Sequence, residues 1–225
     1  MSAADIPAPS PDDVQPTANE ALDRFLTGLI TAQLWVAGTF PTFGEALRHG
    51  AFQTISNLST TGFITTGFVH WPGAAPLLLV LVAFIGGASG STAGGIKVGR
   101  WQMLVRQGLR EVRQLVHPRG QFVVKVGGKR VSESVVISVG GFFVSYVLCY
   151  FALVLALAAT GTDTHTALAA VAASLTNVGP GLGEVALHFA ALNDVATWLC
   201  SFSMILGRLE IFTILVLLTP QFWNE

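Results

Sequence analysis

Two short polar segments that contain glycine have the residue types needed to hold a metal cation through the backbone. They are Ser59-Thr60-Thr61-Gly62-Phe63 and Thr176-Asn177-Val178-Gly179-Pro180. Rings of backbone carbonyls can replace the hydration shell of K⁺. Glycine permits the positive φ angles that turn consecutive carbonyls the same way. One such segment is often an ordinary turn, but two copies at a fixed spacing favour cation coordination.

The spacing between these segments extends to their surroundings. A shift of 117 residues places Gly62 on Gly179 and, without a gap, Gly90 on Gly207. The same shift aligns the six residues that end at Gly62 with the six that end at Gly179. The sequence therefore predicts two copies of one structural unit.

A third glycine-rich segment lies in the first copy only. Six of the 14 residues from Gly86 to Gly99 are glycine. Because each glycine costs a helix about 1 kcal/mol relative to alanine, we expect a helix to break here. The alternative is close helix packing through small residues. A phosphate-binding loop is excluded because no Gly-Lys-Ser/Thr ending is present.

Arg208 is a charged residue inside an apolar stretch. A charge near the centre of a bilayer costs roughly 2.5–3.5 kcal/mol on insertion scales. The 117-residue shift places Arg208 opposite Ser91, within the glycine-rich segment. We expect Arg208 to donate to carbonyls freed by the broken helix and to raise the barrier to cations. The alternative is a structural ion pair with Glu210 or Lys97.

The composition indicates a membrane protein that positions these segments. Of the 225 residues, 52% are apolar and only 11% are charged, whereas soluble domains carry about 25% charged residues. At about 20 residues per span, there is room for four spans. The predicted spans are 25–40, 76–96, 134–160 and 195–220, and the shorter apolar segments, predicted to be re-entrant, are 45–58 and 166–175. Non-helical backbone at membrane depth needs protein or water around it, so two re-entrant loops imply an aqueous pathway.

Charge and cysteine content exclude other classes of protein. The net charge of −1 gives no case for nucleic-acid binding. Cys149 and Cys200 stand in apolar runs without metal-ligand spacing. No nucleophile and base are paired in the sequence, so we do not expect an enzyme.

The basic residues predict the orientation of the chain. Nine of the 12 Lys and Arg residues lie between Lys97 and Arg130. By the positive-inside rule this stretch is cytoplasmic, and so are both chain ends. The re-entrant segments then enter from outside with the partial negative charge of their C-terminal ends toward the membrane centre, which favours a cation. The basic stretch could in addition dock a cytosolic subunit.

Four stretches of the sequence resemble the Trk/Ktr/HKT potassium transporter family, and within it the C-terminal half of the bacterial TrkH type. Residues 86–97 resemble the segment that interrupts the second span of the third repeat. Thr60-Thr61-Gly62-Phe63 and residues 176–182 resemble the third and fourth filter segments. Residues 204–210 resemble the second span of the fourth repeat with its arginine. The resemblance runs from about residue 22 to the end.

This resemblance implies potassium uptake across the bacterial cytoplasmic membrane, with K⁺ as the transported ion and no cofactor. It assigns a selectivity filter to Thr60, Thr61, Gly62, Phe63, Asn177, Val178, Gly179 and Pro180. It assigns a gate to Gly86, Gly87, Gly90, Ser91, Gly94, Gly95, Lys97 and Arg208. A cytosolic nucleotide-binding regulatory subunit is a further expected partner.

The expected fold is an all-α membrane protein with two span–re-entrant pore loop–span repeats, similar to a K⁺ channel. The expected parts are a polar disordered tail at 1–20, a first pore repeat at 21–112, a basic cytoplasmic loop at 113–132 and a second pore repeat at 133–225. The family has four repeats around one pore, and only two are present. We therefore expect a homodimer or a complementary half-chain. The alternative is a non-conducting half-subunit or a truncated fragment that needs another chain.

Overall fold

In the residues that it describes, the computed structural model consists of helices, loops and one short hairpin. It describes residues 11–88, 90–120, 122–126 and 129–217. The α-helices are α1 (Pro11–Val36), α2 (Phe43–Leu58), α3 (Ala75–Ile85), α4 (Val98–Val116), α5 (Glu133–Ala159), α6 (Thr164–Leu175), α7 (Asp194–Arg208) and α8 (Ile211–Leu217). Single 3₁₀ turns occupy Phe68–His70 and Gly183–Val185. Strands β1 (Lys125–Val126) and β2 (Lys129–Arg130) pair antiparallel.

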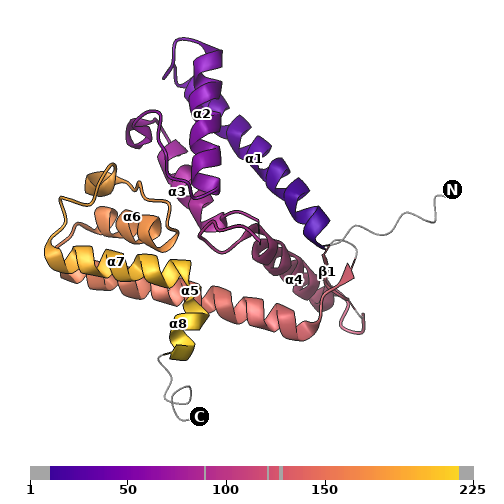
Figure 1. The fold of residues 1–225 in the computed structure, drawn as a ribbon. Coiled ribbons are helices and arrows are strands. Elements are labelled where there is room, and N and C mark those ends of the chain that lie inside the picture. The colour runs from indigo at the N-terminus through magenta and orange to yellow at the C-terminus, as the bar shows by residue number, and fades with distance from the viewer. Residues whose placement is uncertain (1–10, 89, 121, 127–128, 218–225) are drawn as a thin grey trace.

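The helices form two groups that follow one another along the chain (Figure 1). In the first group α2 packs against α1 and α3, and in the second α6 packs against α5 and α7. Contacts between α3 and α6 join the groups. One apolar core runs through both, with Leu79 from the first group and Leu157 and Leu175 from the second fully buried.

The two short helices α2 and α6 begin at side-chain caps. The Thr42 hydroxyl accepts a hydrogen bond from the amide of Glu45, and the Asp163 carboxylate accepts from the amides of His165 and Thr166. Such caps satisfy amides that have no partner within the helix. Nine of the 12 residues of α6 are buried, so this helix lies inside the protein and not on its surface.

The glycine-rich segment breaks the helix where the sequence predicted a break. Helix α3 ends at Ile85, and Gly86 follows with a φ of +70°. The chain stays non-helical until α4 begins at Val98, after Lys97 with a φ of +77°. The predicted span 76–96 is therefore a helix of 11 residues followed by a loop.

The prediction of a continuous last span over 195–220 was wrong. Helix α7 ends at Arg208, and α8 begins at Ile211. Between them Glu210 adopts a φ of +57°, which a helix cannot contain. The Glu210 carboxylate pairs with Arg100 of α4 at 2.8 Å, so the break lies where the chain meets α4.

The N-terminal part of the chain also differs from expectation. The tail predicted at 1–20 is helical from Pro11 onward. Proline suits the first position of a helix, where its missing amide hydrogen is not needed. Residues 1–10 and the last eight residues of the second predicted repeat lie outside the described residues.

One of the described helices, α5, has the length and apolar composition needed to cross a membrane. Helices α3 and α6 are apolar but shorter. The other three predicted spans do not form single helices of that length and composition in the described chain: α3 and α7 end early, and α1 carries polar residues in its first half. The predicted basic loop 113–132 begins as the last turn of α4 and contains the hairpin.

Candidate functional site

The loops that follow α2 and α6 have the same backbone structure. Each helix ends at a hydroxyl residue that bonds back to its own last turn: Ser59 Oγ donates to Ile55 O and Thr176 Oγ1 to Ala172 O, both at 2.7 Å. The next two amides of each loop also bond back to carbonyls of the preceding helix, at positions 117 residues apart. Thr60 N donates to Asn57 O, as Asn177 N does to Ser174 O, and Thr61 N donates to Ser56 O, as Val178 N does to Ala173 O.

The positive φ angles of the two loops also coincide. Thr60 and Asn177 have φ angles of +52° and +55°, and Gly62 and Gly179 have +77° and +99°. Left-handed backbone is uncommon for residues with a side chain. Its occurrence at both matched positions means that the two loops turn in the same way.

The two loops lie against each other at Gly62. A Cβ atom placed on Gly62 would be 1.8 Å from the carbonyl oxygen of Val178 and 3.2 Å from Cδ of Pro180. No side chain fits at that distance, so glycine is needed both for its φ and for this contact. The structure thereby brings together predicted filter residues that are more than 100 positions apart in the sequence.

Most carbonyls of these loops have no protein donor. Within the described parts of the chain, no hydrogen bond reaches the carbonyls of Thr60, Thr61, Gly62, Asn177, Val178, Gly179 and Pro180. The Phe63 carbonyl differs, because it accepts from Ser56 Oγ at 2.7 Å. The aromatic ring of Phe63 is exposed. Seven carbonyls therefore have no protein donor in the described chain, as expected of carbonyls that bind water or a cation.

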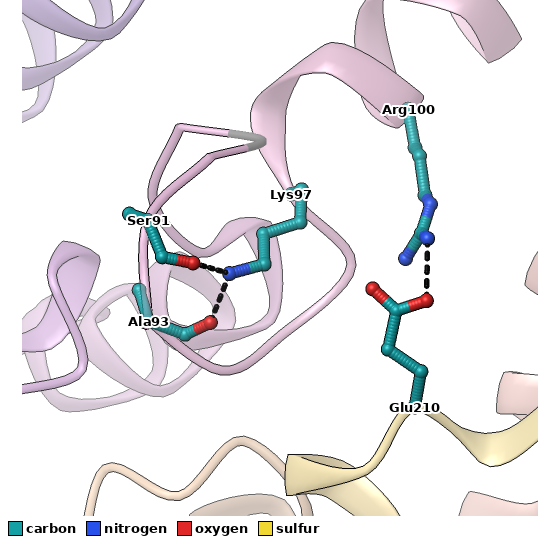
Figure 2. Close-up of polar contacts among 5 residues, drawn as sticks. All are labelled: Ser91, Ala93, Lys97, Arg100 and Glu210. Carbon is teal, nitrogen blue, oxygen red and sulfur yellow. Dashed lines mark hydrogen bonds and ion pairs between the residues drawn. The ribbon is translucent and has the colours of Figure 1, made fainter. Parts of the chain in front are cut away.

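Three carbonyls of the glycine-rich segment, in contrast, do accept hydrogen bonds from side chains. Lys97 Nζ donates to Ser91 O at 2.7 Å and also to Ala93 O (Figure 2). Arg208 Nη1 donates to the carbonyl between them, that of Thr92. Three consecutive carbonyls are thus bound by two cationic side chains, one from each half of the chain. The hydrogen bond expected from Arg208 to this segment is present.

The same segment contacts both filter-like loops through Gly94. The Gly94 amide donates to Thr60 Oγ1 at 2.9 Å. A Cβ on Gly94 would be 1.9 Å from the carbonyl oxygen of Thr176. Gly207 of α7 is equally close to the end of α6, because a Cβ on Gly207 would be 1.9 Å from Leu175 O. The segment therefore packs tightly against the ends of α2 and α6.

The remaining predicted gate glycines are not equivalent. Added Cβ atoms on Gly86, Gly87 and Gly95 would each meet a neighbouring atom of the segment or of α3 within 2.7 Å. Gly90 has no heavy atom within 4 Å of such a Cβ. The conformation of the segment thus requires most of these glycines, but Gly90 has room for a side chain.

We expect Gly94→Ala to destabilise the protein and Gly90→Ala to leave it nearly unchanged. The methyl group at position 94 collides with backbone, which cannot move aside alone, and such overpacking costs about 1–3 kcal/mol. The thermal unfolding midpoint of the detergent-purified chain measures the difference. Equal midpoints for the two variants would contradict the close contact at Gly94.

Arg100 belongs to this site, although sequence reasoning did not select it. It pairs with Glu210 (Figure 2), and its guanidinium lies 4.1 Å from the centre of the Phe142 ring. Among the described residues Glu210 pairs with Arg100 and not with Arg208 or Lys97, so the alternative ion pair was wrong. Nothing in the spacing of nine basic residues distinguishes Arg100 from the others.

The chain is similar in sequence to known proteins. The model of the TrkH family, described as cation transport protein, matches residues 20–224. The Trk system potassium uptake protein TrkH of Vibrio parahaemolyticus is 53% identical over 181 residues, which cover 80% of this chain and 37% of that protein. TrkH of Halomonas elongata is 45% identical, covering 89% and 42%, and TrkG of Escherichia coli K12 is 40% identical, covering 86% and 40%.

The fold matches a solved structure as well. The crystal structure of the potassium transporter TrkH from Vibrio parahaemolyticus superposes with a TM-score of 0.85 at 48% identity, covering 90% of this chain and 43% of that one. The chain spans about two fifths of the length of these relatives. These relatives are bacterial transporters and not enzymes. The chain belongs to the TrkH family of cation transport membrane proteins.

Proposed function

We propose that this chain supplies two of four pore-loop repeats to a potassium-conducting pore in the bacterial cytoplasmic membrane. The observation that carries the proposal is the pair of matched loops whose consecutive carbonyls have no protein donor among the described residues. The relatives are named Trk system potassium uptake proteins, which supports K⁺ as the ion. The proposed repeats occupy 21–112 and 133–225, joined by the cytoplasmic segment 113–132.

In this proposal the carbonyls of Thr60, Thr61 and Gly62, with those of Asn177, Val178 and Gly179, coordinate K⁺. The C-terminal ends of α2 and α6 lead directly into them, and the partial negative charge of a helix C-terminus attracts a cation. Phe63 and Pro180 follow as the residues where each loop turns away. Re-entry of α2 and α6 from the outer side is part of the same proposal.

The glycine-rich segment is the proposed gate. It lies against both filter loops through Gly94, and its carbonyls from Ser91 to Ala93 are held by Lys97 and Arg208. A carbonyl that already accepts a bond from an ammonium or guanidinium group is a poor ligand for a second cation. Two cationic side chains, Lys97 of the segment and Arg208 of α7, therefore lie beside the filter in place of carbonyl ligands, and this arrangement opposes cation passage until the segment moves.

The pore must be completed by further chain, because two filter loops surround only part of an ion. A homodimer would bring two copies of each loop around one axis, and a complementary half-chain would do the same. The relatives are more than twice as long as this chain, which supports the complementary half-chain. In that case the chain alone does not conduct. A cytosolic nucleotide-binding regulatory subunit is the partner proposed for the cytoplasmic side.

Flux in reconstituted liposomes tests the proposal. The purified chain is inserted alone, or together with a co-expressed chain that carries the first two repeats of a TrkH relative, and rubidium tracer uptake is compared with uptake of labelled sodium. Uptake by the chain alone supports self-assembly, and uptake only with the second chain supports the half-subunit. Absence of selective uptake in both preparations would refute the proposed function.

A further inference from the structure

The cytoplasmic helix α4 carries two adjacent stripes of different chemistry. At a period of 3.6 residues, side chains spaced by three and four residues share one face of a helix. The basic stripe is Arg106, Arg110 and Arg113, and the apolar stripe is Val105 (57% exposed), Leu109 (52%), Val112 (58%) and Val116 (67%). Apolar side chains exposed to this degree beside arginines are typical of helices at a membrane surface.

The basic stripe forms one wall of a groove of about 360 Å³. Arg106, Arg110 and Arg113 line it from α4, and Lys125 lines it from β1. Leu109 belongs to the same lining, together with Phe122. The groove thus joins four cationic side chains to apolar surface that continues along the helix.

Two of these four cationic side chains have no polar partner among the described residues. Arg110 pairs with Glu133 at 3.4 Å, and Arg106 donates to the Lys125 carbonyl. In the part of the chain that the structure describes, the Arg113 guanidinium and the Lys125 ammonium have neither a hydrogen-bond nor an ion-pair partner. The groove therefore fits an anionic group.

The position of the groove indicates where such a group would come from. Helix α5, the helix with the length and composition to cross a membrane, begins at Glu133, directly after the hairpin. Figure 1 shows the hairpin at the N-terminal end of α5, next to the end of α4. The groove thus lies at the level where a span meets the lipid headgroups, and basic residues there attract anionic lipids.

We propose that this groove binds the headgroup phosphate of an anionic phospholipid. Arg113 and Lys125 contact the phosphate, and the apolar stripe of α4 lies along the acyl chains. This site goes beyond the proposed ion conduction, since neither residue lies near the filter loops or the glycine-rich segment. The binding measurement below does not depend on ion flux.

Binding of fluorescent phosphatidylglycerol to the detergent-purified chain tests the site, with phosphatidylcholine as the neutral lipid. We expect phosphatidylglycerol to bind more tightly, and Arg113→Gln/Lys125→Gln to weaken it by about 10- to 30-fold, given the usual contribution of two basic side chains at an anionic surface. The fold should persist, because neither side chain has a partner among the residues that the structure describes. The matched control, Arg119→Gln/Arg130→Gln, removes the same charge from the same side but does not line the groove.

Three results would overturn the proposal. Equal weakening by the two double variants would mean diffuse attraction without a site. Equal binding of the two lipids would mean that the headgroup is not recognised and would leave the groove to a protein partner. Displacement of phosphatidylglycerol by inorganic phosphate would identify a site for free anions.

Discussion

Replacing Gly62 by alanine is expected to lower K⁺ flux through the assembled protein by at least about tenfold. The new methyl group would lie 1.8 Å from the Val178 carbonyl oxygen, so one loop must push the other away. Overpacking of this kind costs about 1–3 kcal/mol, and left-handed backbone adds about 1–2 kcal/mol for a residue with a Cβ. Because each 1.4 kcal/mol is a factor of ten in an equilibrium, the native loop pair becomes a minor state. Tracer uptake in liposomes measures the loss.

Two further glycines separate the causes of this effect. Gly67→Ala is the control, because the nearest atom is 3.9 Å away and its φ is −67°. Gly179→Ala introduces the strain of a +99° φ angle without any collision, so its flux should fall between those of the other two variants. Gly62→Ala protein that conducts normally would show that the contact between the loops does not hold the ion path. Unfolding midpoints recorded in parallel exclude simple loss of fold.

The correspondence between the two halves could be predicted from sequence because it is local. The 117-residue shift aligns Thr60 with Asn177 and Gly62 with Gly179, and the positive φ angles occur at these pairs. Capping hydroxyls and glycine set the path of a loop through its own few residues. The break after Ile85 is local in the same sense, since successive glycines weaken a helix wherever it is placed.

The contact partners across the two halves could not be predicted in this way. The break in the last helix falls at Glu210, and Glu210 pairs with Arg100, which lies 110 residues earlier. A hydropathy profile shows Glu210 and Arg100 as two charged residues but does not indicate that they pair. The fit of Gly62 against Val178 likewise depends on how α3 and α6 bring the two halves together, and that packing is not encoded in either loop alone.

Arg208 combines a position that could be predicted from the sequence with a contact partner that could not. Its alignment with Ser91 placed it at the right level, and it bonds to the next carbonyl, that of Thr92. The ion pair considered as its alternative failed because Glu210 points to Arg100. Arg208 has no acidic partner among the described residues, and in the proposed gate its charge would act on a passing cation.

Removal of this side chain by Arg208→Ala is therefore expected to raise K⁺ flux several-fold while the preference for K⁺ over Na⁺ persists. One hydrogen bond to the segment is lost, and at this exposed position we take its worth as about 1 kcal/mol, or about fivefold in the closed population. The loss of a positive charge beside the path adds to the increase. Selectivity should survive because Arg208 has no contact with the carbonyls of the two filter loops. Initial rates of tracer uptake for the two ions give both quantities.

Conservative and distant replacements show which property of Arg208 opposes flux. Arg208→Lys keeps the charge but shortens the reach to the Thr92 carbonyl, so raised flux in this variant assigns the effect to the hydrogen bond, and unchanged flux assigns it to the charge. Arg119→Ala removes a positive charge outside the site and should leave flux as it is. Unchanged or reduced flux in Arg208→Ala would contradict the gate. In that case Lys97, which holds Ser91 and Ala93, keeps the segment in place without Arg208, and the arginine serves only to pack the two halves together.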